Sequence, residues 1–528
     1  MPAPNLMSTI NPPSLDAENL AGSNEPPRLD SMQIFIENLT QTRARLDSVK
    51  DEITRMEQDL RLLSEERDRL EGYVATYQRI LHPVRRLPVD ILREIMRAAV
   101  GDRRERMDLY STVKGLKLNR NSLLPDQIPW VLGQVCHHWQ EVALAFPSLW
   151  SCISVDFPNP GSSNDLLKGL KAQLLRQLQR SGSSKLTIAL RSAHILDDND
   201  SLVAAICSHS SRWESLRMIL PLENIHSLDH LIGGGIPNLR QLYIARDKDT
   251  FGALEDIGAF RVAPRLHDLT VGARNDLDRL PIQWSRITHL RLSLYADAQA
   301  INYSFLRSMP NLTSLYVGGV IFDESTPEVA LPSLQLLTIH VKGDSNFVEP
   351  FLQRINSTHL QALRIHGISQ IAIPSRLGRS LRSLHLGGSR LKSVDPTRMF
   401  TPTPALEDLS LCGSWDDMLS DLSSRDPSTG NLRWLPQLRD IGFYTGAVSE
   451  DCSRESILDL LESRFNGYEA TSANNTMTSA DESRLQKVRI HRSIHLGEHL
   501  VQRLDSLATR GLQVDTSAED WIHFFPGF

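Results

Sequence analysis

Cysteine is scarce in this 528-residue sequence, and its five copies are scattered: Cys136, Cys152, Cys207, Cys412 and Cys452. None stands in a CxxC arrangement or in another paired spacing that a disulfide framework or a structural zinc site requires. Isolated cysteines are typical of proteins in a reducing compartment. We therefore expect a cytoplasmic location, a nuclear location or both, and no metal site.

Long hydrophobic runs and an excess of positive charge are also missing. No stretch reaches about 18 apolar residues, the length that crosses a bilayer. Residues 1–20 lack the basic and apolar regions of a secretory signal. The formal net charge is −6, which gives no global attraction to nucleic acid or to an anionic membrane. We expect neither as a partner.

Catalytic signatures are absent as well: the sequence has no GxSxG, P-loop or HExxH pattern. The three glycines at 233–235 are followed by Ile-Pro rather than by a helix, so they predict a turn and not a phosphate-binding loop. His340, His366 and His491 recur near the ends of predicted strands. Single polar side chains on a solvated sheet face explain them better than a metal site does. We expect a protein that is not an enzyme and has no cofactor.

The N-terminal region contains two contrasting segments. Residues 1–30 are rich in Pro, Asn, Ser and Gly, which predicts a disordered tail. Residues 31–81 contain no proline and follow a heptad repeat, which predicts a long coiled-coil helix. Two interpretations of this helix stay open: pairing, as a homodimer or with another coiled coil, and packing on its own chain. The two seam positions carry Leu39, Leu46, Ile53, Leu60, Val74 and Leu81, and Val49, Met56, Leu63, Leu70 and Tyr77, interrupted only by Thr42 and Arg67.

Residues 82–155 contain two short amphipathic segments. The first begins at Leu87-Pro88, where proline suits the first turn of a helix, and its apolar residues recur at three- and four-residue steps. The second ends before Phe146-Pro147 and closes with Leu149-Trp150. Helices this short bury too little surface to form a comfortable domain, which indicates a partner.

The order of these residues resembles the F-box family, in the form common among fungal F-box proteins. It reads Leu-Pro-x-Asp-Ile-Leu-x-x-Ile from 87, Val-Cys-x-x-Trp-x-x-Val-Ala from 135 and Pro-x-Leu-Trp from 147, and the resemblance covers about residues 82–153. It implies docking on a Skp-type adaptor, which joins a cullin scaffold. Some of the matching positions must form the core of the F-box, and the sequence does not separate them from the docking residues. The matching positions are Leu87, Pro88, Ile91, Leu92, Ile95, Val135, Cys136, Trp139 and Val142.

A polar and basic insert at residues 101–127 separates the two halves of this pattern. It is longer than the connection of a standard F-box. We expect a surface loop that leaves the helical core intact.

Residues 156–515 repeat one pattern, an apolar residue followed by apolar residues three and five positions later. The first nine instances start 21 to 27 residues apart, which is the period of leucine-rich repeats. Residues at +3 and +5 point to one side of a strand, and stacked repeats form a solenoid. The sequence therefore predicts an α/β chain with a parallel sheet on the concave face of a leucine-rich-repeat solenoid. The eleven instances start at Trp213, Leu239, Leu266, Ile287, Leu312, Leu334, Leu360, Leu381, Leu406, Leu438 and Leu485.

Two C-terminal stretches depart from the repeat. Residues 465–483 are low in apolar content, which predicts a disordered loop within the solenoid. Residues 516–528 end in an aromatic cluster that we expect to cap the last repeat.

The residues at +2 and +4 of each repeat point away from the core, onto the face that solenoids use for binding. They mix arginine with aromatic side chains, the types that dominate binding energy between proteins. The candidate substrate-binding residues are Arg217, Tyr243, Arg291, Tyr316, Arg364 and His385.

An F-box followed by leucine-rich repeats resembles the substrate-receptor subunits of cullin–RING ubiquitin ligases. The resemblance implies that the repeats hold an unidentified protein substrate near a ubiquitin-charged enzyme, so that catalysis comes from proximity. The alternative is a protein-interaction scaffold outside any ligase, which uses the coiled coil and the repeats.

Overall fold

The structure is a computed structural model in which the chain divides into two compact units, Met1–Pro88 and Val89–Phe528. Within the described ranges, no helix is long and apolar enough to cross a membrane. The described residues are 15–23, 25–109, 121–158, 162–196, 201–245, 258–272, 280–293, 302–319, 323, 325–341, 348–367, 371–388, 395–413, 416–426, 432–444, 454–473, 485–491, 494 and 496–518.

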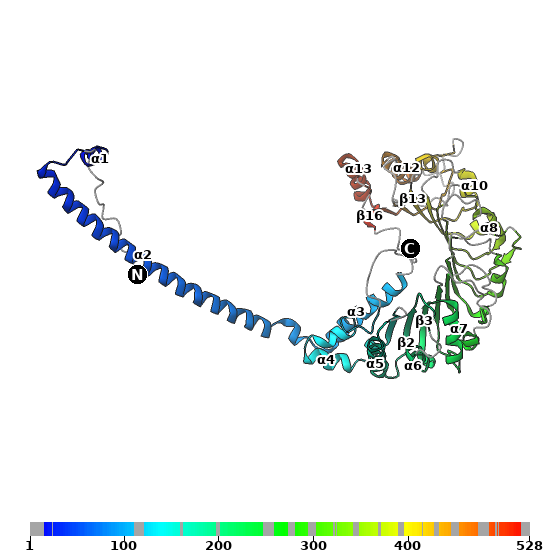
Figure 1. Ribbon diagram of the computed structural model, residues 1–528. Helices are drawn as coiled ribbons and strands as arrows, with labels where there is room; N and C mark the ends of the chain where they lie inside the picture. Colours follow the sequence, from blue (N-terminus) through cyan, green and yellow to red (C-terminus); the bar gives the residue numbers. More distant parts are fainter. Residues whose placement is uncertain are drawn as a thin grey trace. The chain divides into compact units, whose positions relative to one another are not determined.

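The first unit is helical (Figure 1) and contains α1 (Leu15–Ala21), α2 (Leu29–Ile80) and the 3-10 turn η1 (Pro83–Arg86). The predicted long N-terminal helix is confirmed as α2, which spans 52 residues. Ion pairs one turn apart, such as Arg69–Glu66 at 2.8 Å, favour the helix along its surface. The predicted disorder of residues 1–30 is wrong for 15–21, because the good helix formers of Leu15–Ala21 make α1. Residues 1–14 lie outside the described ranges.

The second unit begins with a helical module, which we define as Val89–Trp150. Leu92 and Met96 of the first helix and Trp139 of the third element are buried in the module's core. The two α-helices pack on each other. The elements are α3 (Val89–Leu109), η2 (Trp130–Gln134), α4 (His137–Leu144) and η3 (Pro147–Trp150).

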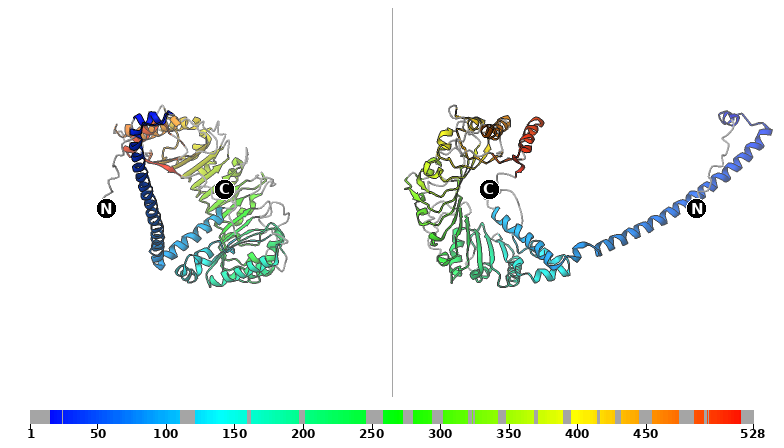
Figure 2. Two further views of the ribbon diagram at one scale, coloured as in Figure 1. Left: turned by 60° about the vertical axis from the view of Figure 1, so that its left-hand side comes forward. Right: turned by 180° about the vertical axis from the view of Figure 1, so that it is seen from behind.

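A 14-stranded parallel sheet follows the module and lines the inner side of a curve (Figure 2). The strands follow one another in chain order, and the short β8 (Val329–Ala330) and β10 (Ile355–Asn356) form a separate ladder. The strands are β1 (Cys152–Asp156), β2 (Leu186–Arg191), β3 (Trp213–Ile219), β4 (Gln241–Ala245), β5 (Asp268–Gly272), β6 (His289–Ser293), β7 (Ser314–Gly318), β9 (Leu336–His340), β11 (Ala362–His366), β12 (Ser383–Gly388), β13 (Asp408–Gly413), β14 (Asp440–Tyr444), β15 (Lys487–His491) and β16 (Gln513–Ala518).

Helices and 3-10 turns connect the strands on the outer side of the curve (Figures 1 and 2). Most of them are short, whereas α5 and α12 span 17 and 20 residues. They comprise α5 (Asn164–Arg180), α6 (Ser201–Cys207), η4 (Ser210–Arg212), α7 (Leu222–Leu231), η5 (Gly258–Val262), η7 (Trp284–Arg286), η8 (Tyr303–Ser308), α8 (Val348–Arg354), α9 (Ser375–Gly378), α10 (Pro396–Phe400), α11 (Asp416–Ser423), α12 (Arg454–Ala473) and α13 (Glu498–Thr509).

The eleven predicted repeats correspond to β3–β7, β9 and β11–β15, so the predicted long parallel sheet of a leucine-rich-repeat-like solenoid is confirmed. The +3 residues stand side by side in register, as in Leu216, Leu242 and Leu269, and are buried. Each such row extends the core of one repeat into the next. Three strands were not predicted. In β2, Lys185 occupies the leading apolar position, although Ile188 and Leu190 keep the +3 and +5 pattern.

Three predicted boundaries are wrong. β1 begins at Cys152, so the sheet starts inside the range 82–155 that we assigned to the F-box. The insert 101–127 is not a surface loop throughout, because 101–109 continue α3 and Ser122 and Leu123 are buried against the solenoid. Residues 465–473 belong to α12, where Phe465 is buried in the core. Residues 516–518 end strand β16, whereas 110–120, 474–483 and the predicted cap at 519–528 lie outside the described ranges.

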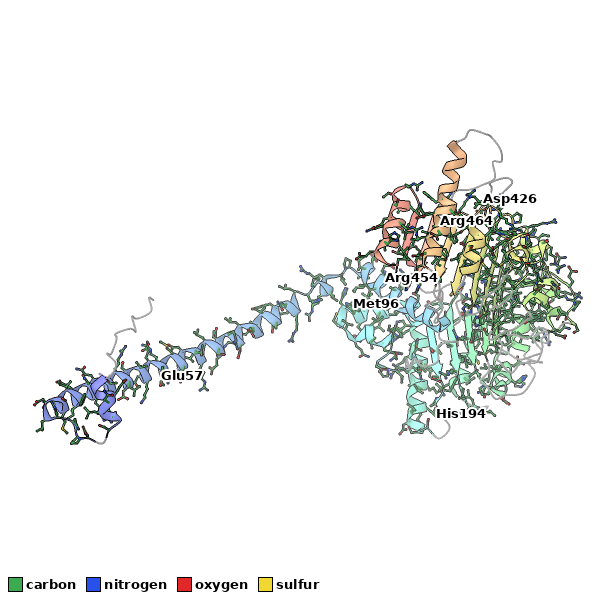
Figure 3. All side chains as sticks on the ribbon, turned by 90° about the horizontal axis from the view of Figure 1, so that it is seen from above. Glu57, Met96, His194, Asp426, Arg454 and Arg464 are labelled. Carbon is green, nitrogen blue, oxygen red and sulfur yellow. The ribbon has the colours of Figure 1, made fainter. Side chains whose placement is uncertain are left out.

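A buried arginine ties the last repeats together. The guanidinium of Arg464 on α12, labelled in Figure 3, donates to the carbonyls of Leu422 (2.9 Å), Trp434 (2.8 Å) and Leu435 (3.0 Å). These carbonyls lie at the end of α11 and in the turn before β14. Because unpaired buried carbonyls are costly, one side chain that satisfies all three stabilises this junction.

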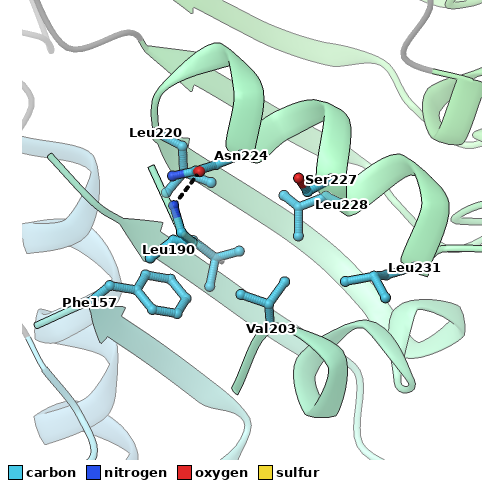
Figure 4. A pocket seen from close by; sticks show the side chains of 9 residues that line it. Phe157, Leu190, Val203, Leu220, Asn224, Ser227, Leu228 and Leu231 are labelled. Carbon is cyan, nitrogen blue, oxygen red and sulfur yellow. Dashed lines mark hydrogen bonds between the residues drawn. The ribbon is translucent and has the colours of Figure 1, made fainter. Parts of the chain in front are cut away.

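The pocket shown in Figure 4 lies between α7 and the strands it covers, and it is lined mainly by Leu190, Val203, Leu220 and Leu228. Asn224 crosses its edge and accepts a hydrogen bond from the backbone N–H of Leu196 at 2.8 Å. Asn224 also donates to the carbonyl of His194 at 2.8 Å. The space is a packing gap beneath α7. Both the oxygen and the nitrogen of the Asn224 side-chain amide are used to hold the loop that contains His194 and Leu196.

Candidate functional site

The six candidate substrate-binding residues form one row across the concave face. The parallel register pairs Arg217 with Tyr243, and continues through Thr270 to Arg291 and Tyr316. It then passes through Thr338 to Arg364 and His385. The +4 positions of these eight repeats therefore lie in a single line, although successive positions are 21 to 27 residues apart in the sequence.

The first part of this row consists of two arginine–tyrosine pairs on neighbouring strands. The Arg217 guanidinium carbon lies 4.0 Å from the centre of the Tyr243 ring, and that of Arg291 lies 6.0 Å from the centre of the Tyr316 ring. Burial raises the pKa of Tyr316 to about 12, against the opposing charge of Arg291, so its hydroxyl stays protonated. Arg217 and Tyr316 are buried, whereas Tyr243 and Arg291 are half-buried. Each pair therefore packs largely on itself, and Tyr243 and Arg291 are the members that a protein ligand could contact.

The second part of the row joins an ion-pair cluster on β13–β15, made by Asp408, Asp440 and Arg489. Arg489 Nη2 lies 2.6 Å from Asp408 Oδ1, and Arg489 Nε lies 3.1 Å from Asp440 Oδ1. Burial alone would lower the pKa of Arg489, but the two carboxylates raise it. Burial raises the pKa of Asp440 despite the opposing arginine. Asp408 and Asp440 occupy +2 positions and Arg489 a +4 position of their repeats, so the repeat pattern places all three on this face.

His385 lies between this cluster and Ser383. Ser383 Oγ is 2.8 Å from His385 Nε2 and donates to Asp408 Oδ2 at 2.9 Å, while Asp408 Oδ2 is 3.4 Å from the same Nε2. Burial lowers the pKa of His385, with Asp408 acting in the opposite direction. A hydrolytic triad needs the carboxylate on one imidazole nitrogen and the hydroxyl on the other. Here both lie at Nε2 of a buried ring, so the group is arranged as a polar network and not as a nucleophile with its base.

The histidines at the strand ends pack on each other. The rings of His340 and His366 are stacked, with centroids 5.0 Å apart. Burial lowers the pKa of His366, which favours the neutral ring. Gly387 on the next strand allows this arrangement, because a Cβ there would lie 2.6 Å from His366 Cδ2. Among the residues that the structure describes, no three His, Cys, Asp or Glu side chains are grouped to hold a metal ion.

The helical module separates the predicted adaptor-binding residues into two groups. Leu92, Trp139 and Val142 are buried in its core. Ile91, Ile95 and Val135 point outward, with exposed fractions of 48%, 39% and 55%. Cys136 is half-buried. Leu87 and Pro88 precede α3 and belong to the first unit, where Leu87 is half-buried and Pro88 exposed.

The module is joined to the first repeat through α5. Trp130 and Trp150 pack edge to face with ring centres 4.9 Å apart. The guanidinium carbon of Arg180 lies over both rings, 4.9 Å from the centre of Trp130 and 4.5 Å from that of Trp150. Buried Gln177, one turn earlier, donates to the carbonyls of Trp150 (3.3 Å) and Cys152 (2.9 Å). Sequence reasoning did not find Gln177 or Arg180, because their partners are distant in the chain.

No protein-family model matches this chain, and no curated protein matches it. Among solved structures, it is similar to the crystal structure of the Rad7 and Elc1 complex in yeast, with 13% identity, a TM-score of 0.35 and coverage of 81% of this chain and 96% of that one. It is also similar to the internalin inlF from Listeria monocytogenes, with 15% identity, a TM-score of 0.28 and coverage of 67% and 89%. At these TM-scores the likeness carries no argument about partners, and the functional interpretation depends on the chain's own residues.

Proposed function

We propose that this protein is the substrate-recognition subunit of a Skp–cullin–F-box ubiquitin ligase in the cytoplasm or nucleus. In this proposal the helical module is the F-box and docks on a Skp-type adaptor, which connects it to a cullin. The concave row binds a protein substrate. The chain performs no chemistry itself and needs no cofactor, because it raises the local concentration of substrate lysines at a ubiquitin-charged enzyme.

The observation that carries the proposal is the exposed apolar stripe on α3. Ile91 and Ile95 lie one turn apart on the outer side of the helix, while Leu92 and Met96 fill the core on the inner side. They occupy matching positions of the F-box pattern, as does exposed Val135. Full burial of an exposed isoleucine contributes about 1.5–3 kcal/mol. Because Ile91 and Ile95 are already about half covered, covering the rest contributes about 1 kcal/mol each, which supports docking of an apolar groove or helix on the module.

The concave row supports the second half of the proposal. Its arginines and tyrosines face the inner side of the sheet, where an extended segment of a substrate can cross several repeats at once. Arginine and tyrosine are enriched among residues that dominate protein interfaces. The polar cluster around Asp408 and Arg489 adds fixed charges that select the orientation of a substrate.

The test is co-purification of the full chain with a Skp-type adaptor and a cullin, followed by size exclusion with light scattering. Wild-type protein is expected to form a stoichiometric complex, and Ile91→Ser with Ile95→Ser is expected to lose it without a change in thermal stability. Val262→Ser with Ile195→Ser is the control, because these apolar residues are even more exposed and lie on the solenoid. Replacing Leu87 and Pro88 by Ala is also expected to abolish adaptor binding. A folded wild-type protein that binds no adaptor contradicts the proposal.

A scaffold outside any ligase is the second candidate. The observation that favours it is α2, a long helix whose apolar seam is not buried within its unit. Such a helix serves a scaffold as well as it serves a ligase subunit. Absence of adaptor binding together with stable self-association would favour the scaffold.

A further inference from the structure

The exposed apolar seam of α2, its two polar interruptions and the charges that flank it indicate which helix can pair with it. The seam runs from Met32 to Tyr77, and none of its side chains is buried within the first unit. Leu46 and Leu63, for example, are 51% and 69% exposed. A seam of this length is characteristic of a helix that pairs with another helix. Helix orientation and register can therefore be tested against the residues that flank it.

We propose that α2 forms an antiparallel homodimer in which residues whose numbers add up to 109 face each other. This register is centred on the midpoint of α2, which spans Leu29–Ile80, so the two helices overlap along their whole length. The proposal does not depend on the ubiquitin-ligase function.

The core layers of this register are matched in polarity. Thr42 of one copy faces Arg67 of the other, so the only two interruptions of the seam meet each other. All other layers are apolar on both sides: Met32–Tyr77, Phe35–Val74, Leu39–Leu70, Leu46–Leu63, Val49–Leu60 and Ile53–Met56. A parallel in-register dimer would instead place the two copies of Arg67 against each other in the hydrophobic core between the helices.

A groove on the helix surface agrees with this pairing. It is lined by Leu63, Glu66, Arg67 and Leu70 at its N-terminal end. These residues lie at i, i+3, i+4 and i+7, the four positions that form a hole for one side chain of a facing helix. In the antiparallel register the small side chain of Thr42 of the second copy enters this hole.

The charged residues that flank the seam disfavour a parallel dimer. A parallel dimer would face Arg45 with Lys50, Glu52 with Glu57 and Glu66 with Glu71, and each like-charged pair would occur twice by symmetry. In the antiparallel register the flanking residues pair two positions off the core pairs, so Arg45 lies beside Glu66 and Lys50 beside Glu57. Glu52 and Asp59 remain a like-charged pair near the centre. Attractive pairs thus outnumber repulsive ones in the antiparallel dimer alone.

The antiparallel arrangement also separates the points at which the second units of the two copies are attached. α2 is 52 residues long, roughly 78 Å at about 1.5 Å per residue. Because the second unit follows the C-terminal end of α2, antiparallel pairing places the second units of the two copies at opposite ends of this rod.

A charge reversal in the full chain distinguishes the two orientations, because it is expected to weaken an antiparallel dimer and to strengthen a parallel one. Arg45→Glu is expected to weaken the dimer roughly tenfold in sedimentation equilibrium, because it replaces two attractions to Glu66 by two repulsions. Adding Glu66→Arg in the same chain is expected to restore wild-type affinity. In a parallel dimer Arg45→Glu would tighten association, because it would face Lys50. Tightening, or a wild-type protein that is monomeric because the seam packs on its own chain, would overturn the proposal.

Cross-linking tests the register independently. Co-expressed Leu46→Cys and Leu63→Cys chains are expected to form a disulfide-linked dimer under mild oxidation, well above the level of wild-type protein with its native cysteines. Each variant expressed alone is expected to stay at the wild-type level. Efficient self-linking of Leu46→Cys would indicate a parallel dimer and would refute the register.

Discussion

Ser122 and Ser154 close the free edge of the sheet with three hydrogen bonds. The backbone N–H of Ser122 donates to the carbonyl of Ser154 at 2.8 Å, and Ser122 Oγ donates to the same carbonyl at 3.1 Å. The backbone N–H of Ser154 lies 2.9 Å from Ser122 Oγ, which accepts its hydrogen bond. Ser154 is the middle residue of β1, the first strand of the 14-stranded sheet. An open edge strand is a template for aggregation. Ser122 occupies the backbone hydrogen-bonding groups of Ser154 on this edge strand.

Ser122→Ala should therefore lower the free energy of unfolding by about 1–3 kcal/mol, because the buried N–H of Ser154 loses its acceptor. Chemical denaturation measures this loss, and hydrogen exchange should show reduced protection of the Ser154 amide. Ser308→Ala is the matched control, since its exposed hydroxyl bonds only within its own turn. Equal effects of the two substitutions would show that Ser122 does not protect the edge.

Arg180→Ala should loosen the attachment of the helical module to α5. The substitution removes a cation that lies over both Trp130 and Trp150, a contact that contributes about 0.5–2 kcal/mol. Arg180→Lys should retain part of this stability, because it keeps the charge but not the planar group. Thermal melting measures the change, with Arg176→Ala on the exposed side of the same helix as the control. A loss as large in the control would contradict this role.

Arg464→Met should be among the most destabilising single changes in the last repeats. It removes the donor for three buried carbonyls, and we expect a loss of about 3–5 kcal/mol. Arg503→Met is the matched comparison, because Arg503 pairs with Glu462 and Asp459 at the surface of α13. The expected loss there is about 1 kcal/mol or less. Urea denaturation distinguishes the two, and similar losses would show that Arg464 is not the junction's main support.

Acidification should destabilise the solenoid from about pH 6.5 downward. Burial lowers the folded-state pKa of His366 and His385 below the ordinary value of 6.5. Around and below that value the unfolded chain binds protons that the folded chain does not, so stability falls as pH falls. Each imidazole contributes at most about 1.4 kcal/mol per pH unit. Urea denaturation between pH 7.5 and 5.5 should give a shallower dependence of stability on pH for His366→Gln than for the wild type, and an equal dependence would contradict this role.

The two proposed docking surfaces should be separable by mutation. Arg217→Ala with Arg291→Ala should reduce the set of ubiquitinated proteins that co-purify with the chain, while adaptor binding is retained. Ile91→Ser with Ile95→Ser should abolish adaptor binding and leave direct substrate binding intact. Quantitative mass spectrometry of both purifications measures the difference. Loss of the adaptor from the first variant would mean that the two surfaces are not independent.

The sequence by itself determined the parts of this protein in which each short segment repeats one local rule. The heptad from Leu39 to Leu81 was enough to predict α2, and the +3 and +5 leucines were enough to predict eleven strands of the sheet. The same rule placed Arg217, Tyr243 and their counterparts on one face, because side chains alternate along every strand. Local periodicity carries this information without reference to distant residues.

Only the tertiary structure decided what depends on contacts between segments that are distant in the chain. It separated buried Leu92 from exposed Ile91, which are neighbours with the same chemistry. It brought Ser122, part of a polar insert, onto an edge strand, and it placed Arg180 over two tryptophan rings that pack on each other. No pattern along the sequence encodes these pairings, since each exists only when two separately folded elements meet and must satisfy each other's polar groups.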